Sequence, residues 1–119
     1  MTEGEAHLLA KLERAVAQDG GMTALADVLQ AVRDRRAQFW QQGDTVAVTQ
    51  MLRYPRGLAL RHWLAAGRVE EACALLPGIE AWGRDRGAVR AEALGRKGWT
   101  RLALRHGYRP QAMLFVKEL

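Results

Sequence analysis

The feature that most constrains this chain is a change in the spacing of its apolar residues near residue 45. Before that point they recur at helical spacing, about every 3.6 residues. Residues 45–52 and 57–64 instead combine apolar and β-branched residues with a period of two, which is typical of strands. A chain that begins with helices and then changes to strands predicts a layered α+β domain.

Two helices are predicted before the first strand. An apolar stripe over residues 8–16 ends at the glycine pair 20–21. Thr23 is the predicted N-cap of a second helix, whose stripe continues to Phe39 and which Gly43 closes.

Strands dominate the rest of the pattern. A short turn with Pro55 joins 45–52 to 57–64 as an antiparallel hairpin, and the second strand is apolar on both faces, so it should be central. In this strand Leu58, Leu60, His62 and Leu64 are predicted to share one face.

The segment after Gly67 predicts a right-handed crossover to a parallel strand. A helical stripe runs from Val69 towards Gly87, with Pro77-Gly78 expected to kink or split it, and residues 88–94 form the next strand. A last short helix, for which Gly107 is the C-cap, and a strand over residues 111–119 complete the order α-α-β-β-α-β-α-β. We therefore expect one domain over residues 1–119 with a mixed sheet whose middle strand pair is parallel, and residues 1–21 are either part of it or an extension.

Composition narrows the class of protein. A chain of 119 residues with 49% hydrophobic residues can fill a core, which argues against disorder. It has no apolar stretch near the ~20 residues of a membrane span, and acidic residues stand where a signal peptide would carry bases, so we expect a soluble protein without a secretion signal. One cysteine, Cys73, and three histidines without ligand spacing predict no disulfide and no metal site.

The predicted order of helices and strands is that of the GNAT superfamily of N-acetyltransferases, shortened and without its usual first strand. Short motifs between about residues 28 and 108 also resemble the small GNAT-like proteins encoded by tailed phages and prophages. They are Gln38-Phe39-Trp40, Thr45–Thr49, Tyr54-Pro55, Ile79–Trp82, Gly95–Trp99 and Gly107-Tyr108.

The resemblance implies where acetyl-CoA would bind and which residues would act on it. The GNAT pyrophosphate turn falls on Gly67 and Arg68, but this chain has only one glycine there and places Glu70 and Glu71 in the following helical turn. The tyrosine that protonates the leaving thiolate in the superfamily falls on Ala103, which has no proton to donate. Both departures predict a catalytically degenerate domain.

The remaining residues with chemical potential favour packing. His62 on a central strand, Cys73 on a helical stripe and Tyr108 beyond the last helix are all interpreted as core residues. Of the four tryptophans most should be core, Trp82 among them, and one or two should anchor a protein contact.

The net charge of +5 comes from the C-terminal part of the chain. Residues 1–83 hold nine Lys/Arg against ten Asp/Glu, whereas residues 84–119 hold nine against three. Bases at the start of the last helix oppose its dipole, which suggests an anionic partner. The predicted interaction surface consists of Arg96, Lys97, Trp99, Arg101, Arg105 and Arg109.

Three functions remain open from the sequence. The first is a degenerate GNAT-like phage or prophage protein that works by protein contacts as a virion, connector or assembly component, alone or as a homo-oligomer, in the host cytoplasm or the virion. The second is a live acetyl-CoA-dependent N-acetyltransferase that uses Gly67 and Arg68 on an atypical cofactor loop. The third is nucleic-acid binding, such as DNA binding, through the basic C-terminal surface.

Overall fold

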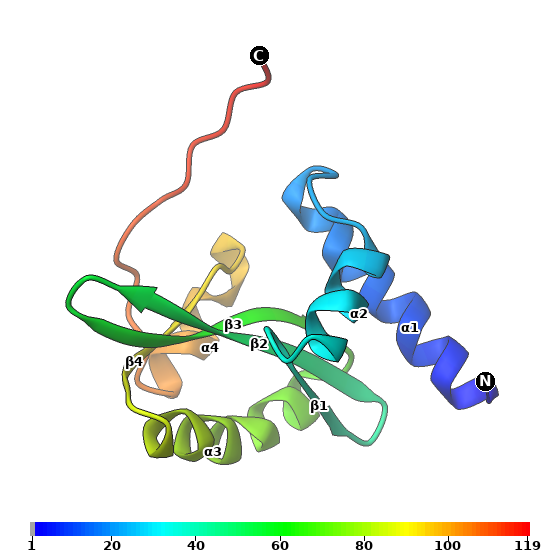
Figure 1. The fold of residues 1–119 in the computed structure, drawn as a ribbon, viewed down its shortest axis with the longest axis horizontal. Coiled ribbons are helices and arrows are strands. Elements are labelled where there is room, and N and C mark those ends of the chain that lie inside the picture. Colours follow the sequence, from blue (N-terminus) through cyan, green and yellow to red (C-terminus); the bar gives the residue numbers. More distant parts are fainter. Residues whose placement is uncertain (1) are drawn as a thin grey trace.

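In a computed structural model that describes residues 2–119, two helical layers enclose one four-stranded sheet (Figure 1). Met1, the first residue of the expected domain, lies outside the described residues. The elements in chain order are α1 (Glu3–Val16), η1 (Ala17–Asp19), α2 (Leu25–Arg33), β1 (Gln38–Gln42), β2 (Thr45–Tyr54), β3 (Gly57–Ala66), α3 (Val69–Asp85), β4 (Ala88–Ala93), η2 (Lys97–Trp99) and α4 (Thr100–Arg105).

The sheet has the spatial order β1-β2-β3-β4. The pairs β1–β2 and β2–β3 are antiparallel, and β3–β4 is parallel across the crossover helix α3. The predicted α+β class, the hairpin and the parallel crossover are therefore confirmed.

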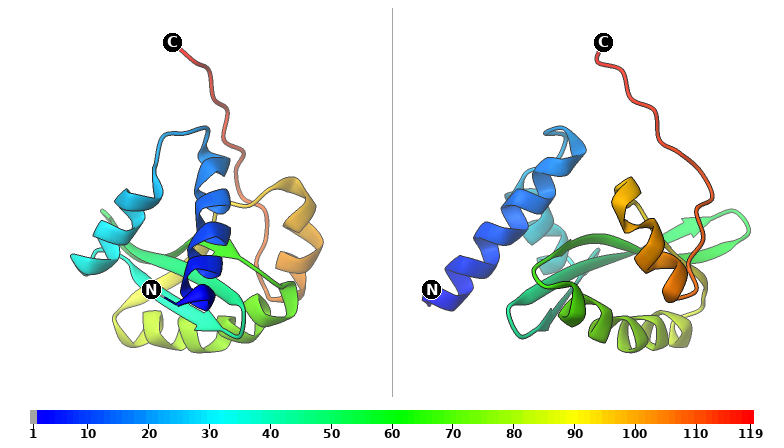
Figure 2. Two further views of the ribbon diagram at one scale, coloured as in Figure 1. Left: turned by 90° about the vertical axis from the view of Figure 1, so that its right-hand side faces the viewer. Right: turned by 180° about the vertical axis from the view of Figure 1, so that it is seen from behind.

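Each face of the sheet has its own core. Helices α1 and α2 cover one face and α3 covers the other (Figures 1 and 2). Successive side chains of β2 point to opposite faces of the sheet, so this strand contributes to both cores. Val46 and Val48 pack with Leu12 of α1 and Val28 of α2. Ala47 packs on the side of α3. Helix α1 thus contributes directly to the core of the sheet.

The second helix is shorter than predicted, and a strand follows it. Helix α2 begins after Ala24, whose amide donates to Asp27, so Thr23 is not the N-cap. The helix ends at Arg33, since Arg35 adopts a left-handed conformation with φ 59° and turns the chain into β1. Phe39 and its neighbours belong to that strand and not to the predicted helix end.

Helix α3 runs unbroken through Pro77, so the helix is not split there. Pro77 and Gly78 lie on the exposed side of the helix, where water can reach the carbonyl group that proline leaves without a partner. Ile79 is fully buried against Leu60 on the sheet, so packing holds the helix together.

The predicted final strand is also absent from the sheet. Residues 109–119 form an extended segment that leaves the domain after α4 (Figures 1 and 2). The observed order therefore gains β1 before the hairpin and lacks a strand after α4. Because of this, the parallel pair β3–β4 lies at one edge of the sheet and not in its middle.

Candidate functional site

The junction between β3 and α3, predicted to hold a cofactor, is tied to β2 by the buried side chain of Thr45. The Arg68 amide donates a 2.7 Å hydrogen bond to Thr45 Oγ1, and this hydroxyl donates to Glu71 Oε1 at 2.9 Å. Gly67 has φ +134°, and a Cβ placed there would lie 2.7 Å from Thr45 Cα. Gly67 therefore allows the close approach of two backbone segments, and the Arg68 amide is already bonded.

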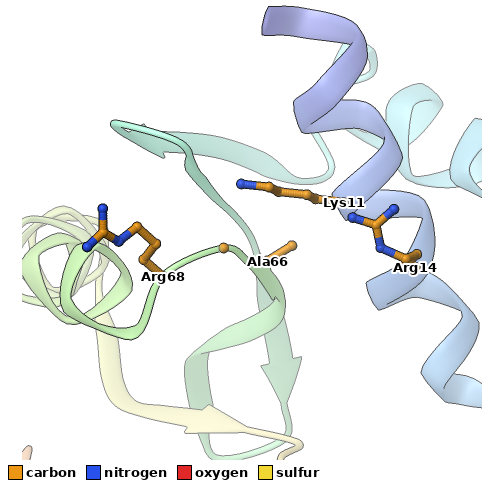
Figure 3. A pocket seen from close by; sticks show the side chains of 5 residues that line it. Lys11, Arg14, Ala66 and Arg68 are labelled. Carbon is orange, nitrogen blue, oxygen red and sulfur yellow. The ribbon is translucent and has the colours of Figure 1, made fainter.

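A shallow basic hollow lies beside this junction (Figure 3). It encloses about 340 Å³ and is lined by Lys11, Arg14, Ala66, Gly67 and Arg68. Lys11 bridges to the carbonyl oxygen of Asp44 at 3.0 Å, and no ion pair within residues 2–119 involves any of the three cations. Lys11 and Arg14 come from α1, so the sequence around Arg68 alone gave no sign of this hollow.

A second cleft lies beyond the ends of β3 and β4, between the start of α3 and the segment that contains η2 and α4. Pairing between the two strands ends at His62 and Ala93, so β3 continues to Ala66 without a partner on that side. A β-bulge at Trp63 interrupts the pairing of β3 with β2 at the same level.

The bulge also changes which residues share a face of β3. Leu60 and His62 point towards α3, whereas Trp63 and Leu64 both pack with the α1–α2 core. The predicted common face for Leu60, His62 and Leu64 is therefore wrong, because the inserted residue shifts the alternation.

This cleft has a volume of about 600 Å³. Its lining comes from the first residue of α3 and from the segment that contains η2 and α4: Val69, Arg96, Gly98, Trp99 and Leu102. The size lies within the range of small-molecule sites, and the lining combines an indole, aliphatic groups and one guanidinium.

A hydrogen-bonded cluster of three side chains lies between β3 and α3. The Tyr108 hydroxyl donates to Glu80 Oε2 at 2.6 Å and is 2.8 Å from His62 Nε2. Because the tyrosine donates its single hydroxyl proton in the hydrogen bond to Glu80, its oxygen can only accept a hydrogen bond from His62 Nε2–H.

Burial shifts the pKa values of His62 and Tyr108 in this cluster. Burial lowers the pKa of His62, and the nearby Glu80 charge opposes the shift in part. Burial raises the pKa of the Tyr108 hydroxyl well above its ordinary value, and the hydrogen bond to Glu80 adds to the shift. The cluster therefore favours a neutral histidine and a protonated tyrosine.

The last helix aims Tyr108 into this cluster. The amide of Gly107 donates to Leu104 and that of Tyr108 donates to Ala103, which is the hydrogen-bond pattern of a Schellman motif. Gly107 has φ +85°, so the predicted glycine cap is present one residue beyond the C-cap His106.

The comparisons with known proteins place this architecture. No family model matches the chain, and no curated protein is similar to it in sequence. Among solved structures, an acetyltransferase from Trypanosoma brucei has a TM-score of 0.69 at 12% identity, over 99% of this chain and 96% of that one. A transcriptional regulator from Bacillus halodurans C-125 has a TM-score of 0.73 at 10% identity, over 100% and 96%. A probable acetyltransferase has a TM-score of 0.64 at 12% identity, over 96% and 91%.

The chain has a GNAT-like fold. The predicted fold is thereby confirmed, and within it Ala103 is half-buried on α4, at the position that the sequence resemblance assigns to the thiolate-protonating tyrosine. Tyr108, whose amide donates to the Ala103 carbonyl oxygen, has its hydroxyl held by His62 and Glu80.

The predicted interaction surface lies on η2, α4 and the residues that follow in this GNAT-like fold. Its six members are exposed, and no ion pair among residues 2–119 involves any of them: Arg96, Lys97, Trp99, Arg101, Arg105 and Arg109. Trp99 is 40% exposed and also lines the second cleft. The other three tryptophans are half-buried, and Trp82 stacks edge-on against Trp40 at 5.7 Å.

Several other predicted features of the GNAT-like fold can be placed. Cys73 is half-buried and free. Within residues 2–119 no three metal-ligating side chains come together, and no helix there is long and apolar enough to cross a bilayer. Sequence reasoning missed the roles of Thr45, Glu80 and Lys11, each of which reaches its partner from a distant element.

Proposed function

We propose that this chain is a GNAT-like binding module that works by contact with a protein partner and does not transfer acetyl groups. One observation carries the proposal: at the turn that would receive the cofactor pyrophosphate, the Arg68 amide is already bonded within the fold. The Thr45 hydroxyl accepts a hydrogen bond from the Arg68 amide, and Thr45 fills the space beside Gly67.

Acetyl-CoA does not fit these residues well. A pyrophosphate needs several free backbone amides that point at one place, together with room for close approach. Here the Arg68 amide is bonded to Thr45, Val69 carries a branched side chain, and Glu70 adds an exposed negative charge to the first turn of α3. Each of these features weakens binding of a diphosphate.

Proton transfer lacks a suitable donor as well. Ala103 has no ionisable group, and the Tyr108 hydroxyl donates to Glu80. The raised pKa of Tyr108 makes this phenol a weaker acid than a free tyrosine. This arrangement supports a structural role for the cluster of His62, Glu80 and Tyr108.

The contact surface is the exposed face of η2 and α4. Arginine side chains that form no ion pair within residues 2–119 are well suited to fork carboxylates on a partner, and Trp99 supplies an apolar anchor among them. We infer that the partner presents an acidic surface with an apolar recess. That this partner belongs to a phage particle rests on the sequence resemblance alone.

A second candidate is N-acetyl transfer, which the cleft between the start of α3 and the η2–α4 segment favours. Its volume of about 600 Å³ would admit the pantetheine arm of acetyl-CoA, and Arg96 would be available to a phosphate at its edge. In that case phosphate binding would depend on Arg96 and Arg68 side chains in place of backbone amides.

The two candidate functions differ in whether the chain turns over acetyl-CoA. The purified chain is incubated with acetyl-CoA and an amine acceptor, either spermidine or a peptide with a free amino terminus, and release of the CoA thiol is followed. The proposal expects release at the rate without protein. Saturable turnover that falls in Arg96→Ala, with Arg84→Ala as the control for an exposed arginine elsewhere, would establish the acetyltransferase and overturn the proposal.

A further inference from the structure

The C-terminal segment combines two properties that are unfavourable in an isolated molecule. It is extended, and its apolar side chains are at least 75% exposed: Met113, Leu114, Phe115, Val116 and Leu119. Four of these are consecutive. A run of apolar residues this long is typical of a strand that is covered on both faces.

The sheet offers an unpaired edge of matching type. Strand β4 pairs with β3 on one side, and within residues 2–119 no strand pairs with its other side. Val89 in the strand and Leu94 just after it are 76% and 62% exposed. Free amides and carbonyls along such an edge recruit another strand unless charge, proline or a bulge blocks them. On β4 the charges of Arg90 and Glu92 pair with each other, and the register with β3 shifts at Val89.

The chain directs its own C-terminal segment away from this edge. The Schellman motif at Gly107 and the bonds of Tyr108 to His62 and Glu80 fix the point at which the segment leaves the domain. From there the segment runs away from the body of the molecule (Figures 1 and 2). Each molecule therefore has one free strand. Of its two sheet edges, β1 and β4, the β4 edge carries the more exposed apolar side chains.

We propose that two copies of this chain exchange their C-terminal segments, so that residues 111–119 of each add as a strand to β4 of the other. The backbone of the added strand would satisfy the edge of β4, and its apolar side chains would cover Val89 and Leu94. A second copy fits better than an unrelated protein, because each copy supplies one free C-terminal segment and one β4 edge. A two-fold arrangement uses both pairs and closes at the dimer.

Sedimentation equilibrium of the full chain tests the proposal. At micromolar concentration we expect twice the chain mass of 13.3 kDa. The double substitution Leu114→Asp with Phe115→Asp should weaken dimerisation at least about a hundredfold, because it would bury two carboxylates in the new strand. Both residues are highly exposed in the single chain, so folding should be unchanged by circular dichroism. Met22→Asp, at a residue 84% exposed between α1 and α2, is the matched control and should stay dimeric.

Cross-linking identifies the occupant of the edge. In a Cys73→Ala background, one batch carries Val89→Cys and another carries Val116→Cys. A disulfide that joins the two different chains after mixing supports exchange. A third variant carries both cysteines in one chain. The proposal would be overturned if the parent were monomeric, if the aspartates did not weaken the dimer, or if a disulfide formed only within the chain that carries both cysteines. The last result would show that the segment folds back on its own β4.

Discussion

The side chain of Thr45 on β2 accepts a 2.7 Å hydrogen bond from the backbone amide of Arg68, 23 residues later in the chain. This bond joins the strand that starts the hairpin to the turn that starts α3. In the GNAT-like fold that turn is where the sequence resemblance places the cofactor pyrophosphate. Its local bonding therefore bears on both stability and function.

Replacement of Thr45 by valine should destabilise the chain by about 1–3 kcal/mol, because the Arg68 amide and the Glu71 carboxylate would lose a buried partner. Urea unfolding measures the change. Thr100→Val is the control, since its hydroxyl bonds to Lys97 at an exposed position, and it should cost much less. Equal costs for the two variants would contradict a special role for Thr45.

Gly67 and Gly78 should respond in opposite ways to alanine. Gly67→Ala would force a Cβ against Thr45 at φ +134°, and we expect a loss of at least about 2 kcal/mol. Gly78→Ala meets no atom within 4 Å inside α3 and should stabilise by about 0.5–1 kcal/mol. Thermal or urea unfolding compares them. If Gly67→Ala kept the parent's stability, the close packing at this junction would be refuted.

His62 should make the chain less stable in mild acid. Burial lowers its folded pKa, so between that pKa and the ordinary value near 6.5 the unfolded chain binds more protons. Stability is therefore full above about pH 6.5 and falls as the pH drops below it, until the folded histidine is also protonated. Unfolding curves across this range should lose this slope in His62→Gln, which keeps a donor for Tyr108. An unchanged slope in that variant would assign it to other groups.

Tyr108 should stay protonated in alkaline solution for as long as the chain is folded. Burial and the hydrogen bond to Glu80 raise the pKa of Tyr108, so this phenol should ionise only when the chain unfolds. The difference in phenolate absorbance between the parent and Tyr108→Phe follows Tyr108 alone, and circular dichroism follows the fold. A Tyr108 phenolate that forms while the chain is still folded would contradict the cluster.

Duplex DNA should bind weakly to the surface formed by η2 and α4. Four phosphate contacts, through Arg96, Lys97, Arg101 and Arg105, would give a log-log salt slope of about −3.6, or a loss of about 150-fold between roughly 50 and 200 mM salt. A protein contact with an apolar anchor should depend less on salt. Fluorescence anisotropy with generic duplex and single-stranded DNA tests this. Submicromolar binding at physiological salt, abolished by Arg101→Ala with Arg105→Ala, would favour the nucleic-acid function.

Local pattern predicted the layers of this fold but not its irregular points. The period of two in residues 45–64 and the crossover through α3 were sufficient for the hairpin and the parallel pair. Strand β1 was missed because Phe39 stands seven residues after Val32 and extends its helical stripe. The turn between them depends on a positive φ at Arg35, a residue type that gives no signal for that conformation.

The candidate site was less predictable because its bonds join distant elements. Arg68 was singled out, but its amide partner Thr45 lies on another strand, and His62 and Tyr108 meet across 46 residues. Such pairs follow from the register of β2 with β3 and from the cap after α4. Neither can be read from spacing along one segment.

Calorimetric titration of the full chain with acetyl-CoA tests the central claim most directly. Because Thr45 already binds the Arg68 amide and packs against Gly67, we predict no saturable heat, with dissociation weaker than about 1 mM, or about −4 kcal/mol. Arg68→Ala should behave like the parent. Stoichiometric binding in the micromolar range that is lost in Arg68→Ala would contradict the account and show that this turn still holds the cofactor.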